Sequence, residues 1–271
     1  MSIDVIRETH RCRQDLHRAE KSLTLQIKAI CRRLCAGAFA AKWKAGEITE
    51  EKYRAGTKAE ADKLYTAIVK EQEHEMLLSG VVTTAAFFEA RAIFEKRRAQ
   101  TEKELERLAK SLPVASWVLE LKGLGLGSLA AIVGEAGDLS NYSTHSKLWK
   151  RLGLAVIDGE RQKRVSGDAA IIHGYCPTRR AIVWNIGRCV LKAQSARVDK
   201  ETGEELKPAG KYRLIYDARK AYELARDPEM SRAHAHNRAT RYMEKKVVRD
   251  LWNSWRQLAN PASETQPEQP E

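Results

Sequence analysis

Residues 119–137 read LELKGLGLGSLAAIVGEAG, and this stretch decides how we interpret the fold. Glycine occupies three alternate positions, Gly123, Gly125 and Gly127, between two apolar segments that we expect to be helical. Glycine adopts positive φ without strain and allows close backbone approach, and Ser128 is a natural N-cap for the second helix. Backbone amides at such a helix start suit a phosphate. The pattern predicts a helix–hairpin–helix that holds nucleic acid, with a plain tight turn between packed helices as the alternative.

The composition favours a soluble chain with an anionic partner. The 271 residues carry a net charge of +12, and the mean hydropathy is −0.52. Clustered Lys and Arg side chains release counterions from phosphate, so nucleic acid is the first partner to consider. A solvated basic surface without a partner is the other interpretation.

Five cysteines with no zinc-binding spacing indicate a reducing, cytoplasmic compartment. The N-terminus lacks the long apolar run of a signal peptide. We find no stretch that approaches the length of a membrane span, so no membrane partner is expected.

The first 112 residues are predicted to form a long antiparallel helical arm, with coiled-coil character. A narrow apolar stripe recurs at steps of three and four along residues 3–35, at Cys12, Leu16, Ala19, Leu23, Ile27, Ile30 and Leu34. Residues 36–57 are read as a break with one short amphipathic piece, before helices over 58–78 and 84–112. An arm of this length could also serve as a homodimer contact.

Residues 113–258 are predicted to form a helix–hairpin–helix-containing helical domain, so the fold class is all-α. Further helices are expected over 144–152, 178–196, 211–226 and 231–258. Asp158-Gly159 is a hairpin signal within residues 153–167, and 199–208 is read as a polar loop. Residues 259–271 are rich in Pro, Gln and Glu, which predicts a disordered tail.

Basic residues are most concentrated between positions 147 and 192, where few acids accompany them. This region is therefore the best candidate for a nucleic-acid face. Together with the glycine turn, it gives the residues predicted to bind DNA: Lys122, Gly123, Gly125, Gly127, Ser128, Lys150, Arg151, Arg161, Lys163, Arg164, Arg179 and Arg180. His234 and His236 lie two positions apart, on different helix faces, so we expect no metal pair there.

Residues 117–154, WVLELKGLGLGSLAAIVGEAGDLSNYSTHSKLWKRLGL, resemble the C-terminal domain of the bridge-RNA-guided insertion-sequence transposases. Glu135, Gly137, Asp138 and Tyr142 match the family pattern, as does the Leu-Gly-Leu that ends a helix at 152–154. Lys122 replaces the proline that is usual there. Gly174 and the Arg179-Arg180 pair stand at the family's distance from Gly153, and the arm is similar to the family's coiled-coil insert.

The resemblance implies a DNA-binding, transposase-related protein of a mobile element that takes part in DNA transposition or recombination. Structured RNA is the alternative nucleic-acid partner. In the family, an RNase H-like domain supplies four acidic residues that hold divalent metal. We find no counterpart in this sequence, so a metal is expected only if a separate acidic domain supplies it in trans, and no other cofactor is evident.

The family's nucleophilic serine follows the Leu-Gly-Leu end, at a place that here falls near Glu160 and Arg161. Ser166 is the nearest serine, and it would serve as a nucleophile only if the loop were re-registered. A serine before a glycine is more often a turn residue. The alternative function is therefore a non-catalytic nucleic-acid-binding accessory protein, and whether the chain is an enzyme stays open. An all-helical protein-interaction module would leave the clustered charge unexplained.

Overall fold

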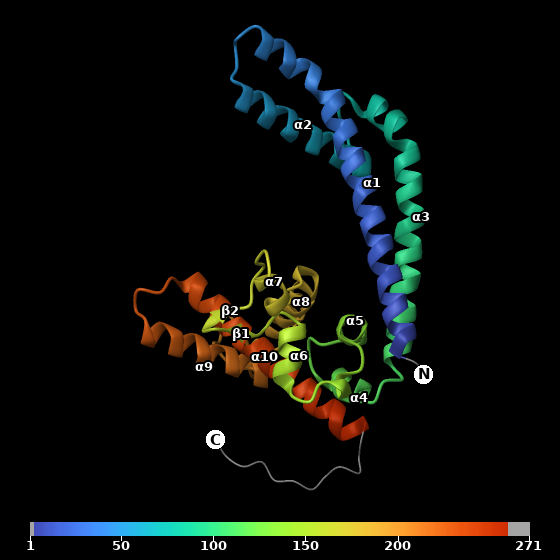
Figure 1. The fold of residues 1–271 in the computed structure, drawn as a ribbon. Helices are drawn as coiled ribbons and strands as arrows, with labels where there is room; N and C mark the ends of the chain where they lie inside the picture. Colours follow the sequence, from blue (N-terminus) through green and yellow to red (C-terminus); the bar gives the residue numbers. More distant parts are fainter. Residues whose placement is uncertain (1–2, 260–271) are drawn as a thin grey trace. The chain divides into compact units, whose positions relative to one another are not determined.

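The computed structural model describes residues 3–259, and these residues are mostly helical (Figure 1), which confirms the all-α class. The long helices are α1 (Ile3–Lys44), α2 (Glu50–Lys70), α3 (Leu77–Ala109), α8 (Pro177–Ala193), α9 (Lys211–Arg226) and α10 (Arg232–Ala259). The shorter ones are α4 (Ala115–Glu120), α5 (Leu126–Ala136), the 3-10 helix η1 (Leu139–Asn141), α6 (His145–Arg151) and α7 (Ala169–His173). The predicted tail, 259–271, lies outside the described residues except for Ala259, which ends α10.

The chain divides into two compact units. Residues 11–102 form one, which we call the arm unit. The segments on either side, residues 1–10 and those from 103 onward, form the other, which we call the main unit. The start of α1 therefore belongs with the C-terminal part of the chain.

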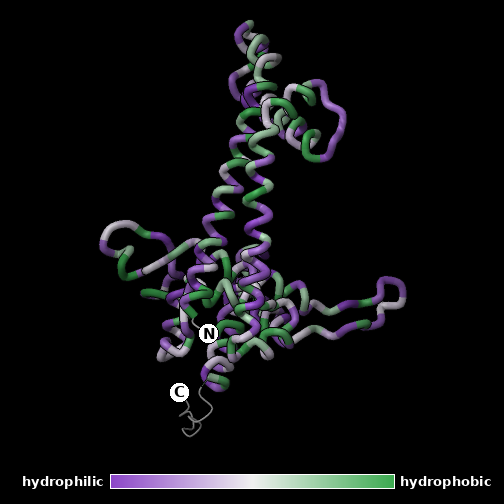
Figure 2. The backbone as a smooth tube through the Cα atoms, turned by 90° about the vertical axis from the view of Figure 1, so that its right-hand side faces the viewer, coloured by the Kyte–Doolittle hydropathy of each residue, from purple (hydrophilic) through white to green (hydrophobic). Residues whose placement is uncertain are grey.

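In the arm unit, three helices share a small apolar cluster. Ile27 and Cys31 of α1 are fully buried with Leu64 of α2. Arginine–glutamate pairs join α1 to α3, with Arg13 Nη2 2.8 Å from Glu102 Oε1 and Arg98 Nε 2.7 Å from Glu20 Oε2. Hydrophilic and hydrophobic residues alternate along these helices (Figure 2), as the narrow apolar stripe predicts.

The predicted break over residues 36–57 is too long, because α1 continues to Lys44 and α2 already begins at Glu50, so only residues 45–49 separate the two helices. Thr49 caps α2 by accepting a hydrogen bond from the Lys52 amide at 3.3 Å. Gly56 is tolerated inside α2 because the ring of Phe39 occupies the space where a Cβ would stand. This glycine therefore makes room for an aromatic ring inside the helix.

The sequence was interpreted as having no stretch that approaches the length of a membrane span. That interpretation is wrong, because α3 is long and apolar enough to qualify by length and composition. Helix α3 contains an 18-residue window with a mean hydropathy of 1.4, and only 11% of it is buried. Its N-terminal half exposes Leu78, Val82 and Ile93. A helix of a soluble protein can pass the same test, so this finding alone does not place the chain in a membrane.

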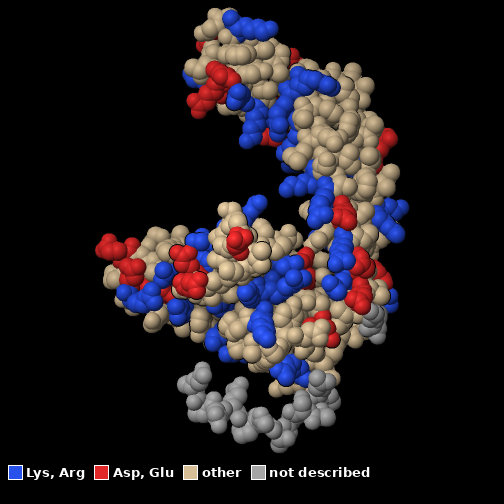
Figure 3. Space-filling view, in the orientation of Figure 1, with Lys and Arg blue, Asp and Glu red and all other residues tan. Residues whose placement is uncertain are grey.

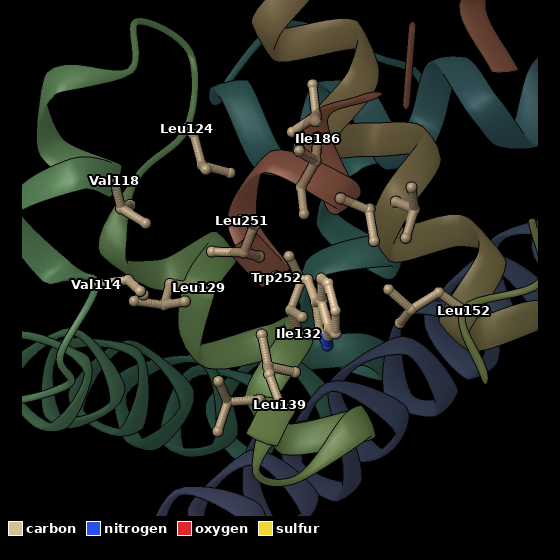
Figure 4. Close-up of a cluster of buried hydrophobic side chains, with 14 of the residues drawn as sticks. Val114, Val118, Leu124, Leu129, Ile132, Leu139, Leu152, Ile186, Leu251 and Trp252 are labelled. Carbon is tan, nitrogen blue, oxygen red and sulfur yellow. The ribbon is translucent and has the colours of Figure 1, made fainter. Parts of the chain in front are cut away.

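The core of the main unit forms around α10. Met243 and Leu251 of α10 are fully buried, and they belong to one cluster with Leu129 and Ile132 of α5 and with residues of α4, α6, α8 and α9. Figure 4 shows part of this cluster, with Leu251 and Trp252 of α10 lying among side chains that include Leu129 and Ile132 of α5. This packing fixes α5, α8 and α10 relative to one another and so positions the surface described below.

Two short antiparallel hairpins interrupt the helices. The hairpin predicted at Asp158-Gly159 is confirmed, with β1 (Val156–Ile157) paired to β2 (Glu160–Arg161). Asp158 and Gly159 both have positive φ, 50° and 77°, as a tight two-residue hairpin turn requires.

The second hairpin, β3 (Arg197–Val198) with β4 (Glu205–Lys207), corrects the loop predicted over 199–208. The Asp199 carboxylate accepts hydrogen bonds from the amides of Glu201 and Thr202, and it thereby organises a turn that the polar composition did not reveal.

Candidate nucleic-acid interface

The glycine turn connects α4 to α5 and packs against α8. The Leu124 amide donates to the Leu121 carbonyl at 3.0 Å, and Gly123 has a φ of 93°. A Cβ on Gly123 would lie 2.6 Å from Val190 Cα and 2.7 Å from the Cys189 carbonyl oxygen. Glycine at this one position therefore allows two backbones to touch.

Gly125 and Gly127 do not have the predicted positive φ, and Ser128 is not the predicted N-cap. Gly125 is the N-cap of α5, with an extended φ of −121°, and nothing stands within 4 Å of the place its Cβ would take. Ser128 lies inside α5 and is not the N-cap, and its amide donates to the Gly125 carbonyl at 3.0 Å. Helix α5 therefore begins at Leu126, two residues earlier than predicted.

The amides at the start of α5 remain available for an anion. Within residues 3–259, the backbone N–H groups of Gly125, Leu126 and Gly127 make no backbone hydrogen bond. However, Glu106 Oε1 lies 3.4 Å from the Cβ position of Gly127, so a carboxylate already stands beside this helix start. An anionic ligand would have to compete with it.

A separate groove of about 710 Å³ is lined by four of the eight predicted basic side chains. It lies between the β1–β2 hairpin, the start of α8 and the first half of α10, and six cationic side chains line it: Arg161, Lys163, Arg164, Arg180, Arg238 and Arg241. No carboxylate is among its lining residues. We call it the basic groove. Figure 3 shows Lys and Arg side chains gathered on the face of the main unit that displays α6 and α8.

Two of these side chains are free of acidic partners. Arg161 and Arg164 are exposed and form no ion pair with any residue between 3 and 259. Lys163 pairs with Glu160, and Arg238 lies 3.0 Å from Glu223 Oε2. The free guanidinium groups are the ones best placed to take phosphate, because they lose no internal partner when they do so.

Gln162 positions this basic segment. Its side chain is buried between the exposed Arg161 and Lys163, where Nε2 donates to the carbonyls of Lys150 and His173 and Oε1 accepts from the Ala155 amide. The alternation of an extended chain then turns the two neighbouring cations outward.

A buried carboxylate stands behind the basic groove. The Glu244 side chain is fully buried, and Arg180 Nη2 lies 2.8 Å from its Oε2. Gly187 provides the room, since a Cβ there would be 2.7 Å from Glu244 Cγ. Burial raises the pKa of Glu244 to about 7, although the charges of Arg180 and Arg241 pull it down. Burial also lowers the pKa of Arg241.

Glu223 shows the opposite balance. Burial raises the pKa of this carboxyl too, but hydrogen bonds from Arg238 and Arg219 outweigh it, so the net shift is downward. Hydrogen bonds from two arginines therefore outweigh burial at Glu223, whereas burial outweighs the charges of Arg180 and Arg241 at Glu244.

We expect the stability of the main unit to fall as pH rises from about 4.5 to about 7. Glu244 binds its proton more tightly when folded, so its contribution is fully present below the unfolded pKa and is lost as pH approaches the folded value. The loss is at most about 3 kcal/mol. Chemical unfolding of Glu244→Gln across this range should lack this fall.

The matched control is Glu223→Gln, whose carboxyl has the lowered pKa. That variant should lose stability relative to the parent chain at neutral pH and not in acid. If Glu244→Gln kept the full pH dependence of the parent chain, Glu244 would not be the titrating group.

The remaining predicted residues do not join the basic groove. Arg179 Nε lies 3.1 Å from Glu135 Oε2, and Arg151 donates to the Glu135 carbonyl. Lys150 is exposed on α6, and none of the predicted residues between 122 and 128 lines the groove. Ser166 is exposed in the loop after β2, outside the groove lining, and its hydroxyl has no hydrogen-bond partner among the described residues. Of the two neighbouring arginines, Arg179 thus pairs with Glu135, whereas Arg180 lines the groove.

Sequence reasoning missed the groove wall that α10 provides. His234, Asn237, Arg238 and Arg241 all line the groove. Their spacing of i, i+3, i+4 and i+7 is that of one helix face, and it could have been found in the sequence.

No group of three or more His, Cys, Asp or Glu side chains that could hold a metal ion occurs in the described part of the chain. The chain matches no protein-family model, and comparison with curated proteins and with solved structures gives no match either.

Proposed function

We propose that this chain is a DNA-binding protein related to the transposases of mobile elements, and that nucleic acid lies along the basic groove. The groove itself carries the proposal: six cationic side chains line it without a carboxylate, and two of them lack any acidic partner. The local charge exceeds what solubility needs and matches a phosphate backbone.

The resemblance of residues 117–154 supplies the transposase relationship. Under this proposal α4, the glycine turn and α5 form a helix–hairpin–helix whose free amides approach a second stretch of backbone. The coiled-coil character of α1 and α3 likewise belongs to the proposal. The Glu106 carboxylate beside α5 makes the turn the weaker of the two contacts.

Binding of DNA duplex and of structured RNA across a salt series tests the proposal. Contacts to several phosphates should make log Kd rise linearly with log salt, with a slope of about 0.9 for each phosphate neutralised on duplex DNA. A response without salt dependence would overturn the proposal for both nucleic acids.

A second function, nucleic-acid binding without chemistry, is favoured by the position of Ser166. A serine nucleophile needs an activating base within hydrogen-bond reach, and the hydroxyl of Ser166 has none among the described residues. Ser166→Ala distinguishes the two functions, because it should abolish strand joining in an active transposase and change nothing in a binding protein.

A further inference from the structure

The basic groove continues past Trp184 into a second groove. This second groove, of about 760 Å³, is lined by residues of α8, α9 and α10, among them Arg188, Lys192 and Arg213. Trp184, Asn237 and Thr240 line both grooves. A ligand that follows the cationic surface therefore passes the indole ring.

Trp184 has the setting of a stacking platform. Its side chain is 42% exposed, although tryptophan is ordinarily well buried. The Arg188 guanidinium lies 4.7 Å from the ring centroid. Arg180, Trp184 and Arg188 stand at steps of four on α8 and so lie on one face of the helix.

A polar group without a partner lies beside the ring. Thr240 is 5% exposed, and its Oγ1 has no hydrogen-bond partner among the described residues. A buried polar atom without a hydrogen-bond partner lowers the stability of the fold. Because Thr240 lines both grooves, a ligand bound there can supply the missing hydrogen bond. The adjacent Asn237 offers both a donor and an acceptor.

We propose that Trp184 stacks on an unpaired base, and that the joined grooves bind a single-stranded segment of nucleic acid. Base faces are inaccessible in a continuous duplex, whereas an unpaired base combines a π face with hydrogen-bonding edges and a charged backbone. Arg161 and Arg164 take phosphates on one side of the ring, and Arg188 and Lys192 take them on the other. Thr240 and Asn237 meet the edge of the stacked base. This inference rests on the proposed function and names the form of nucleic acid that the same surface takes.

The test compares the full chain with Trp184→Ala, using 12-nucleotide oligo-dT, oligo-U of the same length and a 12-base-pair DNA duplex as probes. Trp184→Ala should weaken binding of the single strands by about 5- to 100-fold, the usual effect of removing one stacking contact. Duplex binding and the salt slope should not change, because no cation is removed. The dT and U probes show whether the segment is DNA or RNA.

Two further variants serve as controls for the loss of the aromatic ring at Trp184. Trp184→Phe keeps an aromatic face and should retain most of the affinity for single strands. Trp43→Ala removes an indole from the arm unit that is equally exposed, at 42%, and should have no effect. Thermal unfolding verifies that each variant is folded.

The outcomes separate this inference from the proposed function. If Trp184→Ala binds single strands as well as the parent chain does, or loses duplex and single strand equally, stacking on Trp184 is wrong while nucleic-acid binding stands. If the parent chain binds none of the three probes in a salt-dependent way, the proposed function falls as well.

Discussion

Replacing Gly123 with valine is expected to destabilise the main unit by roughly 2–6 kcal/mol. Two costs add: a β-branched residue is strained at a φ of 93°, and its Cβ would overlap the backbone of α8 at Cys189 and Val190. Backbone atoms inside a helix cannot move aside as the end of a flexible side chain can. Urea unfolding measures the loss.

Gly125→Val is the matched control, because it introduces the same side chain two residues later. Gly125 has an extended φ and open space around its Cβ position. Its replacement should cost about 1 kcal/mol or less, since valine is only a poorer N-cap than glycine. Equal destabilisation by the two variants would mean that the contact with α8 is not what requires glycine in this turn.

The second large effect is expected for Arg161, Lys163 and Arg164, replaced together by glutamine. If each contacts one phosphate, affinity for nucleic acid at 0.1 M salt should fall by roughly 10²- to 10³-fold. The salt slope should decrease by about 3, because one released counterion is lost with each contact. Fluorescence anisotropy at several salt concentrations measures both quantities.

A control that removes the same charge from the arm unit distinguishes binding at the basic groove from a general attraction of nucleic acid to a positively charged protein. Lys21, Arg32 and Arg33 are exposed on α1, and glutamine at these positions also lowers the net charge by three. That variant should bind nearly as well as the parent chain. Equal losses in the two triple variants would contradict a localised interface.

Local chemistry made several elements predictable. Asp158-Gly159 specifies a tight hairpin through its backbone preferences, so β1 and β2 were found at the predicted place. The long C-terminal helix was found within one residue of its predicted bounds, because the apolar period over residues 231–258 is strong. Gly123 was predicted to allow close approach, and it does so against α8.

The parts that sequence reasoning missed depend on residues distant in the chain. Gly56 lies inside α2, within the predicted break, and its contact with the Phe39 ring cannot be inferred from local sequence. Arg179 and Arg180 are neighbours in sequence, yet one turns to Glu135 and the other to Glu244. The groove wall on α10 needs both the helix face and its packing against α8, and only the first of these is visible in the sequence.

The way Gln162 holds the basic hairpin has a consequence for how salt affects the surface. An uncharged amide fixes the base of the segment through neutral backbone groups, so ionic strength leaves its geometry intact. The arginine and lysine on either side act through Coulomb attraction, which salt screens. Weaker nucleic-acid binding in concentrated salt would therefore reflect the screening of Arg161 and Lys163, and not a change in the shape of the hairpin that carries them.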